Sequence, residues 1–185
     1  MSLTEDVKNT LTSVISGAGD VVSTTQNVAK ENLVKAVQGV SDVTITGTQA
    51  ISEVVTGGVQ AVTAAGSSLT AGVTGLVEGV VDGAKEVGVD TTQAAGDAAS
   101  TAVQTVSAVG GDVGEAAVAA VEGAIKAAGD IGADTATLAT SAVKGTLKAA
   151  DEIGSDAGSL VRKALLNAAA LPHDIIDALL TGKTE

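Results

Sequence analysis

Several residue types that build ordinary protein cores are missing from this chain. Its 185 residues include no phenylalanine, tyrosine, tryptophan or cysteine, and only one proline and one methionine. Aromatic side chains contribute much of the buried area of most cores, so a core here must consist of valine, isoleucine, leucine and alanine. The absence of cysteine excludes disulfides, thiol catalysis and thiolate metal sites.

Positive charge is scarce as well. Ten lysine and arginine residues stand against 22 aspartate and glutamate residues, which gives a net charge of −12. Neutralisation of phosphates supplies most of the affinity of nucleic-acid-binding proteins, so we expect no nucleic-acid partner. The chain is nevertheless 45% hydrophobic, which is too apolar for ordinary disorder. We therefore expect its apolar side chains to be buried against copies of the chain or against a lipid-like surface.

What the chain does contain is a 22-residue repeat without insertions or deletions, a signature of repeat proteins. The apolar positions recur at steps of three or four residues, which is an 11-residue register doubled to 22, and such positions line one face of an α-helix. We take this apolar stripe as the candidate interface, and it comprises Leu11, Ile15, Val21, Leu33, Val37, Val43, Val55, Val59, Val77, Val81, Val87, Val103, Val109, Val121, Ile125, Ile131, Val143, Leu147, Ile153 and Leu165.

Two columns of glycine follow the same period. To the first column we assign close packing between helices, and it comprises Gly66, Gly88, Gly110, Gly132 and Gly154. The second column either permits close helix approach or supplies small residues to a thin polar face or to loops. It comprises Gly57, Gly79, Gly123 and Gly145, with Thr101 at the equivalent position.

These patterns predict an all-α protein, either one long amphipathic helix or an extended hairpin of a few helices, built from continuous 22-residue units. We divide the chain into a lead-in at residues 1–10, a repeat array at 11–158 and an atypical C-terminal cap at 159–185 with a helix–proline–helix pattern. We expect any turns at Gly57–Gly58, at Gly110–Gly111 or near Pro172. Glycine, valine and threonine lower helix propensity, so the helix should gain order only where its stripe is buried.

The sequence gives little indication of a catalytic site. The sequence has no nucleophile motif and no complete dinucleotide or phosphate-binding motif. His173 is the only histidine, and we interpret it as a surface or capping residue. Acidic pairs four residues apart are read as a solvated helix face, with weak binding of divalent cations as the alternative. We expect a protein that is not an enzyme and has no cofactor, no metal ligands and no small-molecule substrate.

The segment from Gly79 to Val89 and the stretch from Gly58 to Gly66 resemble the 11-residue amphipathic repeats of synucleins and perilipins. The resemblance covers most of the chain as a class of pattern. It implies extended helices that lie on membranes or lipid droplets. Synuclein repeats carry a lysine-rich motif, whereas this chain is acidic, so we do not expect a preference for anionic lipid.

We therefore expect a non-enzymatic amphipathic-helix protein that coats or shapes a hydrophobic or membrane-like surface. The alternative is a self-assembling structural protein that forms a helical bundle, filament or sheath through its stripes. A coat leaves one face wet along its whole length, whereas a packed array buries more than one face. We see no signal peptide and no transmembrane span, and expect a cytoplasmic location, peripheral to a membrane or an inclusion.

Overall fold

The computed structural model describes residues 2–16, 19–39 and 46–181. Within these ranges the chain forms nine helices and no strand, which confirms the prediction of an all-α protein. The helices are α1 (Leu3–Ile15), α2 (Val21–Val37), α3 (Gly47–Ala64), α4 (Leu69–Val87), α5 (Thr91–Ala108), α6 (Val113–Ile131), α7 (Thr135–Ile153), α8 (Ser155–Asn167) and α9 (His173–Thr181).

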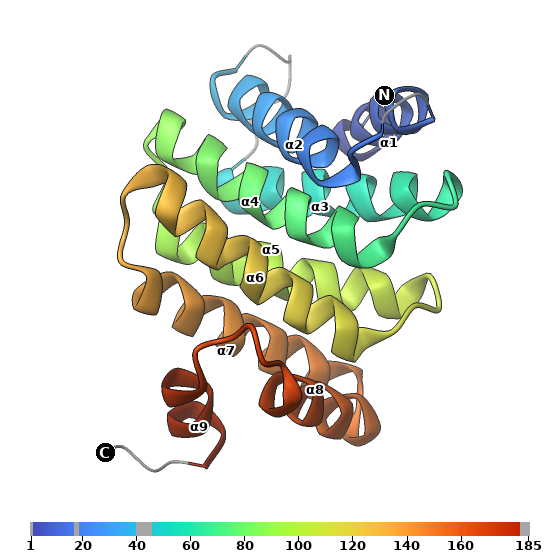
Figure 1. Cartoon of the computed structure of the whole chain (residues 1–185). Helices are drawn as coiled ribbons and strands as arrows, with labels where there is room; N and C mark the ends of the chain where they lie inside the picture. Colours follow the sequence, from blue (N-terminus) through green and yellow to red (C-terminus); the bar gives the residue numbers. More distant parts are fainter. Residues whose placement is uncertain (1, 17–18, 40–45, 182–185) are drawn as a thin grey trace.

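The helices lie in two rows (Figure 1). The odd-numbered helices follow one another along one row and the even-numbered helices along the other, and each helix also packs on its sequence neighbours across the rows. Neighbours within a row are parallel, because their contacts advance in the same direction, from Val22 with Gly75 to Lys30 with Gly83. This is the arrangement of a short α-solenoid, in which each unit contacts only nearby units.

The prediction of one long helix or an extended hairpin is wrong, because the first glycine column ends the helices. Gly66, Gly88, Gly110 and Gly132 have φ values between 66° and 79°, a left-handed conformation that terminates an α-helix. Two residues after each of these glycines, a side chain caps the next helix; these N-caps are Ser68, Asp90, Asp112 and Asp134. The repeat therefore encodes a turn every 22 residues.

The same observation corrects the close-packing role that we assigned to this column. A Cβ atom added to Gly66, Gly88, Gly110, Gly132 or Gly154 would meet no other described atom within 4 Å. These glycines are needed for their backbone conformation and not for their small size. The turn expected at Gly57–Gly58 is also wrong, since both residues lie inside α3, whereas the turn at Gly110–Gly111 and the break near Pro172 are confirmed.

The first hairpin, α1–α2, turns four residues earlier than the later units do. Val22 occupies the position of the glycine column in this unit, and a β-branched residue strongly disfavours the left-handed conformation. Helix α2 instead begins at Val21, after Asp20, whose carboxylate accepts a hydrogen bond from the Ser23 amide at 3.1 Å. The equivalent helix α4 begins at Leu69, whose counterpart two repeats earlier is Thr25.

Gly123 and Gly129 inside α6 and Gly132 at its C-cap differ in environment, so we predict three different effects of substitution by alanine. We expect Gly123→Ala to destabilise the protein by roughly 1–3 kcal/mol, because its Cβ would lie 2.5 Å from the Thr74 carbonyl oxygen. Gly129→Ala should stabilise it by about 1 kcal/mol, since that site is open and inside the helix. Gly132→Ala should cost about 1 kcal/mol because of its positive φ.

Urea unfolding followed by circular dichroism measures these three differences in the free energy of unfolding. Gly129→Ala is the matched control for Gly123→Ala, because both exchange the same atoms on the same helix. Equal stabilisation by the two substitutions would contradict the close contact between α4 and α6.

Candidate functional site: a helix-packing column and a carboxyl cluster

The structure places most of the predicted apolar stripe inside the stack. Eleven of its residues are buried, namely Leu11, Ile15, Leu33, Val55, Val59, Val77, Val81, Val103, Val121, Val143 and Leu165. Seven are half-buried, namely Val21, Val37, Val87, Val109, Ile125, Ile131 and Leu147. Ile153 is 39% exposed, and Val43 lies outside the described residues. The stripe thus meets other helices of the same chain in this structure.

The second glycine column is where helices in a row come closest. A Cβ on any of its glycines would collide with a backbone carbonyl oxygen of the helix two before it in the chain. The pairs are Gly57 with Thr4, Gly79 with Gln26, Gly123 with Thr74 and Gly145 with Gly96. Of the two interpretations of this column, the structure supports close helix approach.

Hydroxyl groups accompany these close contacts. At the position where the column has threonine, the Thr101 hydroxyl lies 3.3 Å from the Ser52 hydroxyl across α3 and α5. The Ser141 hydroxyl donates to the Thr92 carbonyl oxygen at 2.6 Å, and the Thr74 hydroxyl donates to that of Ala119 at 3.2 Å. Such short polar side chains fix the axial register between parallel helices, because each reaches only one residue of the neighbouring helix.

A cluster of carboxyl groups lies where α2, α4 and α6 meet. Glu78 of α4 is only 8% exposed, and its Oε2 atom is buried without a hydrogen-bond partner in the described part of the chain. Burial raises the pKa of Glu78 to about 7, and the neighbouring carboxylate of Asp130 on α6 adds to the effect. Burial also raises the pKa of Asp82, one turn further along α4.

Only one of the two carboxyl oxygen atoms of Asp82 has a hydrogen-bond partner on α2. Its Oδ2 atom accepts a hydrogen bond from Gln26 Nε2 at 2.9 Å. Its Oδ1 atom is buried and has no partner among the described residues. The nearest ion pair between α2 and α4 joins Lys30 to Glu86, at 3.2 Å between Nζ and Oε2, and both side chains are more than 40% exposed.

The sequence pattern did not single out this cluster. The signal was two carboxylates four residues apart within an otherwise apolar run, Leu76-Val-Glu-Gly-Val-Val-Asp82. The acidic residues that it did single out are exposed, as is His173, and Asp90 and Asp134 among them serve as N-caps. Across the described ranges, no three His, Asp or Glu side chains are placed to hold a metal ion.

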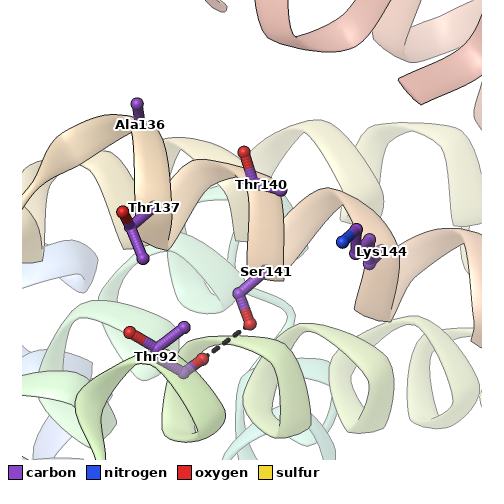
Figure 2. A pocket seen from close by; sticks show the side chains of 6 residues that line it. All are labelled: Thr92, Ala136, Thr137, Thr140, Ser141 and Lys144. Atoms are coloured by element: carbon purple, nitrogen blue, oxygen red, sulfur yellow. Dashed lines mark hydrogen bonds between the residues drawn. The ribbon is translucent and has the colours of Figure 1, made fainter. Parts of the chain in front are cut away.

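The surface hollows described here are open to solvent. The hollow in Figure 2 lies between α5 and α7, has a volume of about 430 Å³, and is lined by Thr92, Ala136, Thr137, Thr140, Ser141 and Lys144. Its Ser141 hydroxyl is engaged with the Thr92 carbonyl oxygen, and its Thr137 hydroxyl with the capping Asp134. Lys144 is its one ionisable side chain, so the hollow lacks a pair of groups for acid–base chemistry.

The end of the even row exposes larger apolar side chains. Leu160 and Leu166 of α8 are 56% and 40% exposed. Helix α8 packs on α6 within the row and on α7 and α9 across it, and its outer side is covered by no helix of the described chain. Over the same residues, no helix is long and apolar enough to cross a membrane.

Comparison with known proteins adds no family to this description. The sequence matches no protein family and no curated protein, and no solved structure matches the chain.

The carboxyl cluster predicts that the protein loses stability as pH rises. The pKa of Glu78 is higher in the folded state than its ordinary value of 4.5, so the folded state binds the proton more tightly. Stability is then retained below about pH 4.5 and falls as pH increases towards about 7, by about 3 kcal/mol in all. Glu78→Gln should remove this contribution and leave the protein more stable than the wild type at about pH 8.

Urea unfolding at a series of pH values measures this contribution. Glu115→Gln, which removes one exposed carboxyl of α6, is the control for the loss of a negative charge. A wild-type stability that stays level or rises between about pH 4.5 and about pH 7, with no difference in Glu78→Gln, would be incompatible with the buried carboxyl.

Proposed function

We propose that the protein is a non-enzymatic structural protein, which packs amphipathic helices into an array and associates with further copies of itself through the end of that array. The observation that carries this proposal is the burial of two faces by the inner helices. Helix α4 buries Val73, Leu76 and Val80 on one face, and it presents Gly75 and Gly79 to the backbone of α2 on another.

Burial of two faces favours an array over a one-sided coat. Every residue of α4 from Gly72 to Val81 is buried, whereas a helix lying on lipid keeps one face in water. Each glycine inside a helix costs about 1 kcal/mol relative to alanine. That cost is offset where the missing side chain lets another helix approach, and it is not offset on a face that meets water.

The end of the even row offers a place for the next copy. Helix α4 is followed in its row by α6, and α6 by α8, but α8 presents Leu160 and Leu166 to solvent. Terminal units of helical arrays usually have a polar outer face that stops further stacking. A second copy that covers this face would bury the two leucines as α8 buries the outer face of α6.

We expect Leu160→Glu to abolish this association without unfolding the protein, because Leu160 is the most exposed of the large apolar residues and a charge there opposes burial. Light scattering coupled to gel filtration, over a range of protein concentrations, measures the mass. Wild type should grow in mass with concentration and Leu160→Glu should stay monomeric. Ala136→Glu, on an exposed flank of α7, is the control and should behave as wild type.

A wild-type protein that stays monomeric at the highest concentration would refute self-association. So would a loss of association in Ala136→Glu equal to that in Leu160→Glu, because the effect would then arise from net charge and not from the end of the row.

Coating of a lipid surface is the second candidate, and the length of the turns supports it. Three or four residues separate successive helices from α3 to α7, so helix and turn together keep the 22-residue period. If the turns became helical, the stripes of successive units would align on one face. The stripe is buried in the stack, so adsorption requires the stack to open.

A disulfide that locks the stack tests this second candidate. The Ser52 and Thr101 hydroxyls are 3.3 Å apart across α3 and α5, and the chain has no other cysteine, so Ser52→Cys with Thr101→Cys can cross-link them. If the protein coats lipid, the reduced form should float with neutral vesicles and the oxidised form should not. Equal flotation of the two forms would refute opening, and absence of flotation in the wild type would refute the lipid function.

A further inference from the structure

One face of α8, at the C-terminal end of the stack (Figure 1), is exposed along the whole helix. We call it the outer face of α8, and its residues are Asp156, Leu160, Lys163 and Asn167. They follow one another at steps of four, three and four residues, so they line one side of the helix. Leu160 is 56% exposed. The outer face therefore has an apolar centre, with an acidic residue before it and a basic residue after it.

The two charges of the outer face have no partner of opposite charge in the described part of the chain. Two ion pairs form among the described residues, and neither includes Asp156 or Lys163. The adjacent Arg162 is engaged, because its guanidinium pairs with the Asp151 carboxylate at 3.0 Å. Asp156 and Lys163 are about 10 Å apart along the helix, which is too far for them to pair with each other.

This charge pattern is complementary to its own reverse. If a second copy of α8 runs antiparallel to the first, with both Leu160 side chains at the centre, Asp156 of each copy lies opposite Lys163 of the other. If the two helices run parallel in register, each charge faces a like charge. A two-fold axis perpendicular to the helices produces the antiparallel arrangement, and two-fold dimers are the commonest homo-oligomers. The outer face of α8 thus fits a second copy of itself.

The opposite end of the stack offers no such match. Helix α2, which begins the even row, exposes Asn27, Glu31 and Lys35 at steps of four residues. A polar face of this kind is typical of a terminal unit that stops stacking. The one large apolar side chain exposed at this end of the described chain is Val14, on α1 in the other row. Head-to-tail association through α2 would therefore place Leu160 against charged side chains.

Antiparallel pairing also gathers other exposed apolar side chains. It brings the start of each α8 beside the end of the other. Ile153 precedes α8 by two residues and is 39% exposed, and Leu166 lies one residue before the end of the helix and is 40% exposed. Ile153 of one copy and Leu166 of the other thus come to the same end of the contact. Three of the four large apolar side chains exposed in the described chain then lie in or beside it.

We propose that two copies of the chain associate through their C-terminal ends, with the α8 helices antiparallel about a two-fold axis beside Leu160 and with Asp156 of each copy paired to Lys163 of the other. This pairing rests on the self-association proposed above and specifies the surface of the partner. Because a two-fold contact uses the same face on both copies, the assembly is a closed dimer. The polar α2 end of each copy stays free.

Exchange of the two charges tests the pairing. Lys163→Asp and Asp156→Lys should each raise the dissociation constant of the dimer by about tenfold or more, because each turns two ion pairs into two repulsions. Asp156→Lys combined with Lys163→Asp restores opposite charges across the axis and should return association to near the wild-type level. Sedimentation velocity over a range of concentrations measures the mass, which should stop increasing at two copies.

Lys35→Asp is the matched control, because it makes the same change in net charge at an exposed site on the opposite end of the stack. It should dimerise as the wild type does, and circular dichroism checks that each variant is folded. Equal weakening by Lys35→Asp and Lys163→Asp would overturn the proposal. So would a double variant that associates as weakly as the single ones, or a mass that continues to increase beyond two copies.

A disulfide tests the position of the axis, because the native chain has no cysteine. In the proposed dimer the thiols of two Leu160→Cys chains lie beside each other, so oxidation should join the chains on a non-reducing gel. Asn167→Cys is the control, since its two copies are about 20 Å apart along the helices, beyond the reach of a disulfide. Equal cross-linking of the two variants would contradict the pairing. So would the absence of cross-linking in Leu160→Cys when its reduced form is dimeric.

These measurements separate the pairing from self-association as such. A wild type that stays monomeric at the highest concentration would refute both. A wild type that associates without the expected response to charge exchange and to oxidation would refute the antiparallel α8 contact alone, and association through another surface would stand.

Discussion

The approach of helix backbones to within contact at the second glycine column is the constraint on which the rest of this structure depends. A core without aromatic side chains has little bulk to fill the space between helices. The helices approach closely because side chains are absent at the contacts, as where Gly79 meets Gln26 and Gly145 meets Gly96. Valine, alanine and leucine then suffice to fill the space between the rows.

Close approach also explains why charge is a problem at one place in the stack. Where two helices are in contact, a long side chain on the contact line must lie in the groove between them. Glu78 and Asp82 lie on that line between α2 and α6, and burial raises the pKa of both. Most of the other acidic residues are exposed.

The burial of two faces per helix has the largest bearing on function. Burial of two faces distinguishes a packed array from a surface coat, because a helical glycine is favourable where it faces another backbone and unfavourable where it faces water. The apolar stripe that resembles lipid-surface repeats is, in this structure, the inner face of the array. Of the four large apolar side chains that are exposed in the described part of the chain, Leu160 and Leu166 lie on α8, at the end of a row, and the other two are Val14 of α1 and Ile153 of α7. The proposed self-association and the alternative of lipid adsorption both start from this arrangement.

The sequence by itself determined the helical class, the 22-residue period and most of the core, because apolar spacing of three and four residues is local information. The sequence also contains the turn signal, which is a glycine two residues before Ser68, Asp90, Asp112 or Asp134. Its period alone suggests a packing column. Only the tertiary structure decided which glycine column caps helices and which touches them, since both share one period. It alone brought Gln26, Glu78 and Asp130 together, because their separation in sequence depends on how the rows stack, and no local pattern encodes that register.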